Sequence, residues 1–157
     1  MKKMRGNCFC VTLLSLALFQ GNMFWWGNRA VYRVPNLGDE MPCEPQAQYR
    51  LLISSAETAP SCLAWFNGVA FEVAGAQGSK VIYVAIDDPR YRTPEGIHPG
   101  SRLNEVLAVA ATEPLAEPGW AFHTRLESGW NVAFVNGPTM THEPLPRDSE
   151  VKWLYKR

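Results

Sequence analysis

Short apolar runs alternate with turn-forming residues in the middle of the chain. Leu63–Phe66 precedes Asn67-Gly68, a dipeptide typical of two-residue β-hairpin turns. Val69–Val73 precedes a glycine-rich turn, and Lys80–Ile86 holds five strand-favouring residues among seven. Because each run is too short for a stable helix and each turn reverses the chain, residues 63–86 are predicted to form an antiparallel meander. Twelve Gly and twelve Pro among 157 residues also argue against a bundle of long helices.

Further strands are expected at residues 49–54, 120–126, 130–135 and 151–155, which are rich in aromatic and β-branched residues. Apolar and polar residues alternate in 120–126, which predicts a half-buried strand with His123 and Arg125 on its polar face. Residues 31–46 contain many turn formers and are expected to be an irregular lead-in held by Cys43.

One short helix is expected at about residues 101–111. Ser101 is a suitable N-cap, and Glu105 lies near the first turn, where the helix dipole favours an acid. Leu103, Val106, Leu107 and Ala110 follow the spacing of one buried helix face. The predicted fold class is therefore α+β: a twisted antiparallel sheet of about five to seven strands with one short helix packed on it, in a single domain of residues 31–157.

The N-terminus has the layout of a secretory signal. Lys2, Lys3 and Arg5 precede an uncharged apolar run, Cys8–Phe19. Residues 1–30 are therefore predicted to be a signal peptide or an N-terminal membrane anchor. As an anchor, residues 8–26 are about long enough to span a bilayer, with Phe24, Trp25 and Trp26 at the far interface; a buried soluble helix is the remaining alternative. Either of the first two readings exports the domain, to the periplasm or to the outer side of the inner membrane.

Two cysteines, Cys43 and Cys62, remain outside the targeting segment. In an oxidising compartment such an isolated pair is expected to form a disulfide; a metal pair or a catalytic thiol is the alternative. Without residues 1–28 the chain has twelve basic and fifteen acidic residues, a net charge of −3. A mildly acidic domain without a cluster of basic residues is not expected to bind nucleic acid, and the sequence indicates no cofactor.

The stretch Thr93–Leu107 is the best candidate for a ligand site. Glycine and proline alternate just before the predicted helix, so that free backbone N–H groups could bind an anion. The candidate ligand-binding residues are Gly96, His98, Gly100, Ser101 and Arg102. The alternative is a structural corner that docks the helix on the sheet.

No catalytic or metal motif is present. His98, His123 and His142 are far apart in sequence and show no ligand spacing. Asp87 and Asp88 are neighbours on an extended chain, so their side chains point in opposite directions and do not form a carboxylate dyad alone. Four tryptophans, Trp65, Trp120, Trp130 and Trp153, belong either to the core or to an exposed protein or glycan interface.

Three segments, "TPEGIHPGSRLNEV", "ESGWNVAF" and "VKWLYKR", resemble small exported bacterial proteins of unknown function over roughly residues 63–157. A looser resemblance links the first segment to small outer-membrane assembly lipoproteins and to β-lactamase-inhibitor-like folds, which implies protein binding.

Two functions follow as hypotheses. The first is a non-catalytic exported envelope protein that binds another protein or a cell-wall component. The second is a small periplasmic hydrolase or ligand-binding protein that uses a histidine–acid pair.

Overall fold

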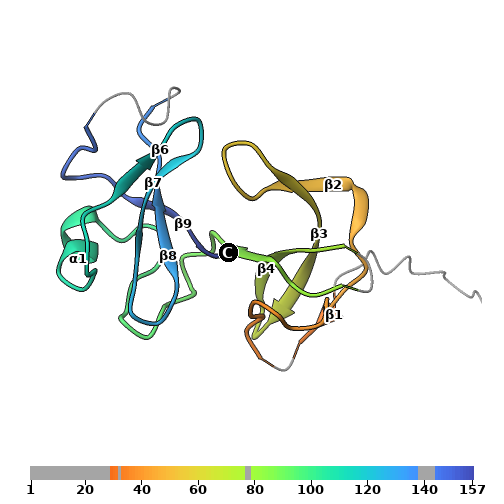
Figure 1. The fold of residues 1–157 in the computed structure, drawn as a ribbon. Helices are drawn as coiled ribbons and strands as arrows, with labels where there is room; N and C mark the ends of the chain where they lie inside the picture. The colour runs from red at the N-terminus through yellow and green to blue at the C-terminus, as the bar shows by residue number, and fades with distance from the viewer. Residues whose placement is uncertain (1–28, 32, 77–78, 138–143) are drawn as a thin grey trace, which may run out of the picture.

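Nine strands form one sheet, and the computed structural model places a single helix beside it (Figure 1). It describes residues 29–31, 33–76, 79–137 and 144–157. The strand order is β1-β3-β4-β5-β9-β8-β7-β6, with β2 paired to β3. Pairing is antiparallel except between β1 and β3. The elements are β1 (Arg29–Ala30), β2 (Gln46–Leu52), β3 (Thr58–Phe66), β4 (Val69–Ala74), β5 (Tyr83–Ile86), α1 (Leu103–Leu107), β6 (Leu115–Glu117), β7 (Ala121–Arg125), β8 (Asn131–Phe134) and β9 (Val151–Lys156).

The predicted meander is confirmed as β3, β4 and β5. The hairpin between β3 and β4 turns at Asn67 and Gly68, both with positive φ, as the sequence predicts. Strand β5 is shorter than expected because Val81 pairs with the lead-in instead. The Val81 N–H donates to the Asp39 carbonyl, and the Gly38 N–H donates to the Val81 carbonyl.

The strand count exceeds the expected five to seven because two short edge strands give little sequence signal. Strand β1 contains Arg29 and Ala30, which the sequence had assigned to the targeting segment. Strand β6 lies in a stretch with two prolines that resembles a loop, and β7 is the strand with which it pairs. The rest of the targeting segment, including the membrane span predicted at 8–26, lies outside the described residues. Within the described part, no helix is long and apolar enough to cross a membrane.

The sheet is curled, so that its two ends approach each other (Figure 1). The β2–β3 turn meets the end of β6 through Glu117, whose carboxylate accepts a hydrogen bond from the Ser55 N–H at 3.0 Å. Arg157 completes the link: it pairs with Glu117 at 2.5 Å and donates to the Ile53 carbonyl at 3.2 Å. These contacts join residues 40, 62 and 104 positions apart, and they close the sheet around a concave face.

Both faces of the sheet carry a hydrophobic core. The first core contains Phe71, Val84, Val132 and Leu154 and is covered by α1, the lead-in and the loop before α1. The second core lies on the concave face and consists of Ile53, Ala59, Ala74, Tyr83, Ala85, Trp120, Ala121, Ala133 and Tyr155. The alternation predicted for β7 is confirmed, because Phe122, Thr124 and Leu126 are buried, whereas Arg125 is exposed and His123 is half-buried. The side that carries His123 also meets the second core, through the buried Ala121.

Helix α1 spans Leu103–Leu107, about half the predicted length. The N-cap is Arg102 rather than Ser101, because the Ser101 carbonyl is already bonded to the N–H of Val151 at 2.8 Å. With Arg102 as the N-cap, Glu105 is the third residue of the helix, the position of the acid in a capping box. Its carboxylate accepts a hydrogen bond from the Arg102 N–H at 2.6 Å. Leu103 and Val106 are buried against the sheet, as predicted.

The predicted disulfide between Cys43 and Cys62 is confirmed, with a Cα–Cα distance of 6.1 Å. It ties the lead-in to the middle of β3. Because Cys43 is buried in the first core, the bond also fixes the segment that covers this face of the sheet.

Candidate functional site

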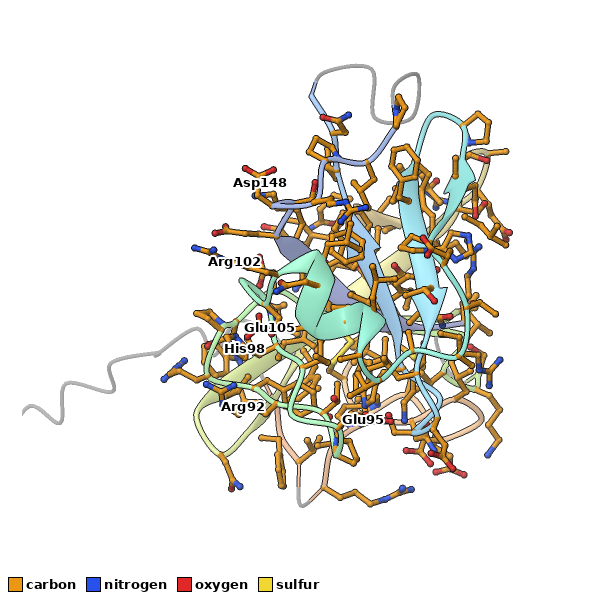
Figure 2. The ribbon with its side chains drawn as sticks, turned by 90° about the vertical axis from the view of Figure 1, so that its left-hand side faces the viewer. Arg92, Glu95, His98, Arg102, Glu105 and Asp148 are labelled. Atoms are coloured by element: carbon orange, nitrogen blue, oxygen red, sulfur yellow. A yellow bond between two sulfur atoms is a disulfide. The ribbon has the colours of Figure 1, made fainter. Side chains whose placement is uncertain are left out.

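The Gly96–Arg102 corner, the site predicted from sequence, has the expected backbone geometry. Gly96 and Gly100 have φ of +87° and +94°, values that favour glycine. Figure 2 shows Arg92, His98 and Arg102 along one side of the molecule near α1.

The backbone N–H groups of this corner are bonded inside the protein. Those of Gly96 and Ser101 donate to the carbonyls of Thr93 and His98, and that of Gly100 donates to Val151. The N–H groups of Ile97 and His98 donate to the hydroxyls of Thr93 and Ser101. Those of Arg102 and Leu103 donate to the Glu105 carboxylate and the Ser149 carbonyl. The corner therefore lacks the free donors on which the anion-site hypothesis depended, and ligand binding there stays a prediction.

The loop before α1 contacts two other segments that the sequence singled out, residues 127–134 and 151–157. The Glu95 carboxylate accepts the N–H of Ser128 at 2.6 Å and its hydroxyl at 2.8 Å. Burial would raise the pKa of Glu95, but the hydrogen bonds that its carboxylate accepts outweigh it and hold that pKa below its usual range. Because the Gly100 N–H also donates to the Val151 carbonyl, this loop is fixed to both segments.

No histidine side chain is hydrogen-bonded to a carboxylate in the described chain. His123 and Glu117 are 3.7 Å apart, beyond hydrogen-bond distance, and Glu117 is held by Arg157. Burial, followed by the charge of Arg157, lowers the pKa of His123 against the opposing effect of Glu117. The His98 ring lies against its neighbouring carbonyl, that of Pro99, and His142 lies outside the described residues. Across the described ranges, no three His, Cys, Asp or Glu side chains are grouped to hold a metal.

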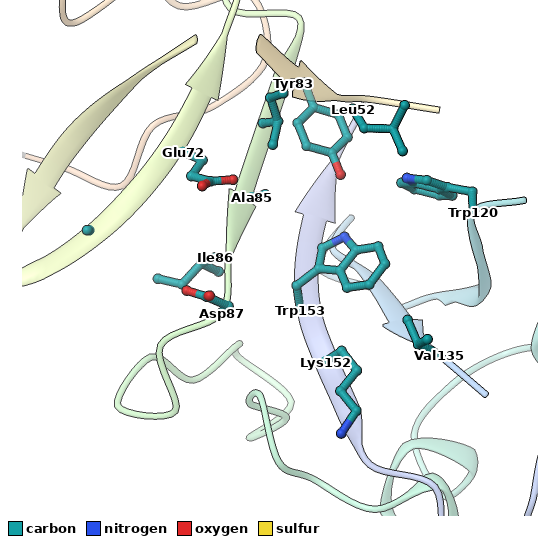
Figure 3. Close-up of a pocket in the computed structure, with 12 residues that line it drawn as sticks. Leu52, Glu72, Tyr83, Ala85, Ile86, Asp87, Trp120, Val135, Lys152 and Trp153 are labelled. Carbon is teal, nitrogen blue, oxygen red and sulfur yellow. The ribbon is translucent and has the colours of Figure 1, made fainter. Parts of the chain in front are cut away.

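A groove of about 330 Å³ opens on the concave face of the sheet. It receives side chains from β2, β4, β5 and β9 and from the segments beside β7 and β8 (Figure 3). Its volume lies in the range of small-ligand sites. The lining residues are Leu51, Leu52, Ala70, Glu72, Tyr83, Ala85, Ile86, Asp87, Trp120, Val135, Lys152 and Trp153.

Small residues create this groove, and aromatic residues bound it. The β4–β5 register sets Glu72 opposite Ala85, and the β8–β9 register sets Ala133 opposite Trp153, so short side chains alternate with long ones. Trp120 packs edge-on against Trp153 and against Tyr155, with ring centroids 5.7 Å and 4.8 Å apart. These rings are fixed by one another and do not collapse into the space above the alanines.

The polar groups of the groove lie on two sides. Figure 3 shows the carboxylates of Glu72 and Asp87 on the β4–β5 side, across from Trp120 and Trp153. The Glu72 side chain is exposed to solvent, but the groove residues around it are mostly apolar. This environment, followed by the charge of Asp87, raises the pKa of Glu72 above its usual range.

The Tyr83 hydroxyl adds a polar group to the wall, and Figure 3 shows it on the side of Trp153. Tyr83 is 1% exposed. Burial raises the pKa of Tyr83, so the hydroxyl is neutral and can both donate and accept a hydrogen bond.

No pattern in the sequence predicted this groove. Trp120 and Trp153 were expected in the core or at an interface; the structure buries Trp120 in the second core, at 3% exposed, and leaves Trp153 half-buried, and both residues line the groove. A usable signal was present in β4, where Ala70, Glu72 and Ala74 alternate with three large apolar residues. Small residues in such positions indicate a face that is covered but not filled.

A comparison of the chain with protein-family models, with curated proteins and with solved structures finds no match in any of the three.

Proposed function

We propose that this protein is an exported, non-catalytic binding protein, and that the groove on its concave face holds another envelope protein or a cell-wall component. The groove itself carries the proposal. It is concave, mostly apolar and walled by aromatic rings, with few polar groups, which is the usual composition of a binding site.

Two further observations support this function. The Cys43–Cys62 disulfide suits an oxidising compartment outside the cytoplasm, in agreement with the signal expected in residues 1–30. The groove also carries no histidine, cysteine or serine among its lining residues, so its chemistry suits recognition better than nucleophilic catalysis.

The test is to fill the groove and follow the partner. Ala70→Trp adds a large ring at the groove wall, whereas Ala116→Trp adds the same ring at an exposed alanine of β6 outside the groove. Tagged full-length chains would be cross-linked in intact envelopes, and the recovered material would be identified by mass spectrometry. We expect wild type and Ala116→Trp to recover the same species, and Ala70→Trp to lose it while keeping the wild-type melting temperature.

Equal recovery by the two folded variants would overturn the groove as the binding site. The mass of the N-terminal peptide of the same recovered chain would decide between a cleaved signal and a retained anchor. Finding the chain in the cytoplasmic fraction would overturn the export part of the proposal.

A further inference from the structure

We propose that the partner enters the groove with a lysine side chain, whose ammonium lies against Glu72 and Asp87 and whose hydrocarbon stem lies along the aromatic wall. This inference rests on the proposed function, because it names the chemistry that the same groove recognises.

The sheet register brings the two carboxylates to one place. Glu72 on β4 is paired with Ala85 on β5. Asp87 follows Ala85 by two residues, so it lies on the same face and diagonal to Glu72. Both residues line the groove, and each contributes to its negative charge.

These carboxylates have no cationic partner in the described part of the chain. The ion pairs there join other acids, namely Asp39, Glu40, Asp88 and Glu117. The one cation that lines the groove, Lys152, extends away from both carboxylates in Figure 3. Two like charges side by side among apolar groups are costly unless a positive charge joins them, so the groove is complementary to a cation.

The rest of the groove suits the stem and the backbone of such a side chain. Trp153 and Trp120 present aromatic surface across from the carboxylates (Figure 3), and aromatic rings attract ammonium groups as well as methylene chains. The Tyr83 hydroxyl in the wall adds a group that can hydrogen-bond to the backbone of the incoming chain. Acids and aromatics therefore act on the same ligand from opposite sides.

Lysine fits better than arginine for a geometric reason. A guanidinium is planar and binds best to two oxygens of one carboxylate, side by side. Here one carboxylate is on β4 and the other directly follows β5, and a compact ammonium with three donors can face both at once.

Three peptides that differ in one residue test the inference. Acetylated and amidated Ala-Leu-Lys-Leu-Ala would be compared with the same peptide carrying norleucine, which keeps the stem without the charge, and with one carrying Glu. Binding to the full-length protein would be followed by amide chemical shifts in β4, β5 and β9. We expect the lysine peptide to bind about tenfold more tightly than the norleucine peptide, the equivalent of about 1.4 kcal/mol, and the Glu peptide to bind most weakly.

Variants locate the effect. The double variant Glu72→Gln/Asp87→Asn should bind the lysine and norleucine peptides equally, whereas Glu57→Gln, which removes an exposed carboxylate outside the groove lining, should keep the wild-type preference. Equal binding of these two peptides to wild type, or a preference that survives the double variant, would overturn the lysine inference and leave the groove as the site. Lysine-peptide binding that persists unchanged in Ala70→Trp would instead count against the proposed function.

Discussion

At the scale of single residues, alanine and glutamate side chains set the shape and the charge of the concave face. The second core includes one alanine from each of five strands, and each of these five is at most 6% exposed. Of the five, Ala85 lines the groove, together with Ala70 of β4, and a larger residue at either of these two positions would reduce the volume of the groove. The five are Ala59, Ala74, Ala85, Ala121 and Ala133.

Glu72 gives a pH-dependent prediction at this scale. Its pKa is raised in the folded protein, first by burial and then by Asp87, so the folded state binds the proton more tightly than the unfolded state. Above its raised pKa, ionised Glu72 therefore destabilises the folded state. This destabilisation disappears as the pH falls through the raised pKa and below the ordinary glutamate pKa of about 4.3. We expect Glu72→Gln to melt at a higher temperature than wild type at pH 7 and at the same temperature at pH 3.

Thermal melts across this pH range would check the prediction, with Glu57→Gln as the exposed control. A stabilisation of Glu72→Gln that did not change with pH would contradict it, because a packing effect of the amide has no reason to depend on proton binding.

At the scale of elements, the lead-in is held by a few long-range ties rather than by regular structure. Between β1 and β2, the described residues of the lead-in form no helix or strand, and their pairing with the sheet is the isolated bridge between Glu40 and Lys80. The disulfide from Cys43 to β3 is the covalent tie, and it keeps the lead-in over the first core.

Removing the disulfide should therefore destabilise the whole domain. A loop of this length contributes about 3 kcal/mol by the chain-entropy estimate. We expect Cys43→Ala/Cys62→Ala to lose about that much free energy of unfolding in urea, and reduced wild type to match it. If the double variant were as stable as the oxidised protein, the lead-in would have to be held by its other contacts alone.

At the scale of the whole molecule, the curl of the sheet depends on Arg157. Its guanidinium pairs with Glu117 and lies 4.4 Å from the ring centroid of Trp120. The hydrogen bond from Arg157 is the main reason that the pKa of Glu117 is lowered, against the effect of burial. One residue thus connects β9, the β2–β3 turn and the edge strand β6.

We expect Arg157→Ala to lower the free energy of unfolding by about 1–3 kcal/mol, since hydrogen bonds to charged groups are of that order. The loss should be largest near neutral pH and should shrink as acid protonates Glu117, because a lowered carboxyl pKa adds stability only above it. Hydrogen exchange at the Ser55 amide should accelerate at the same time. Unchanged exchange at Ser55, with Arg147→Ala as the exposed control, would show that the curl is held elsewhere.

Much of the local structure could be predicted from the sequence. The Asn67-Gly68 hairpin, the strands of the meander and the buried helix residues Leu103 and Val106 all depend on patterns that act within a few residues. The Cys43–Cys62 disulfide was predictable for another reason, because these are the two cysteines outside the targeting segment. The errors have equally local causes. Ser101 was named as the helix cap because its side chain suits that role, but its backbone is used by β9.

The candidate site depends on contacts between residues that are distant in the sequence, and local patterns could not predict it. Gly96, Gly100 and the residues around them were singled out because the backbone N–H groups of an isolated turn before a helix are free. In the folded protein these N–H groups donate to carbonyl, hydroxyl and carboxylate oxygens of other residues. Glu72 and Asp87 were not paired because fifteen residues separate them in the sequence, and only the β4–β5 register brings them to one face.

The sequence by itself determined where the chain turns, which residues favour strands and which cysteines pair, since these depend on backbone preferences and on local side-chain chemistry. Only the tertiary structure decided that both faces of the sheet are covered. Alternation along a strand shows that two faces differ, but the curvature of the sheet sets what each face meets. Long-range contacts such as that of Arg157 with Glu117 join the ends of the curled sheet, and the groove opens on its concave face.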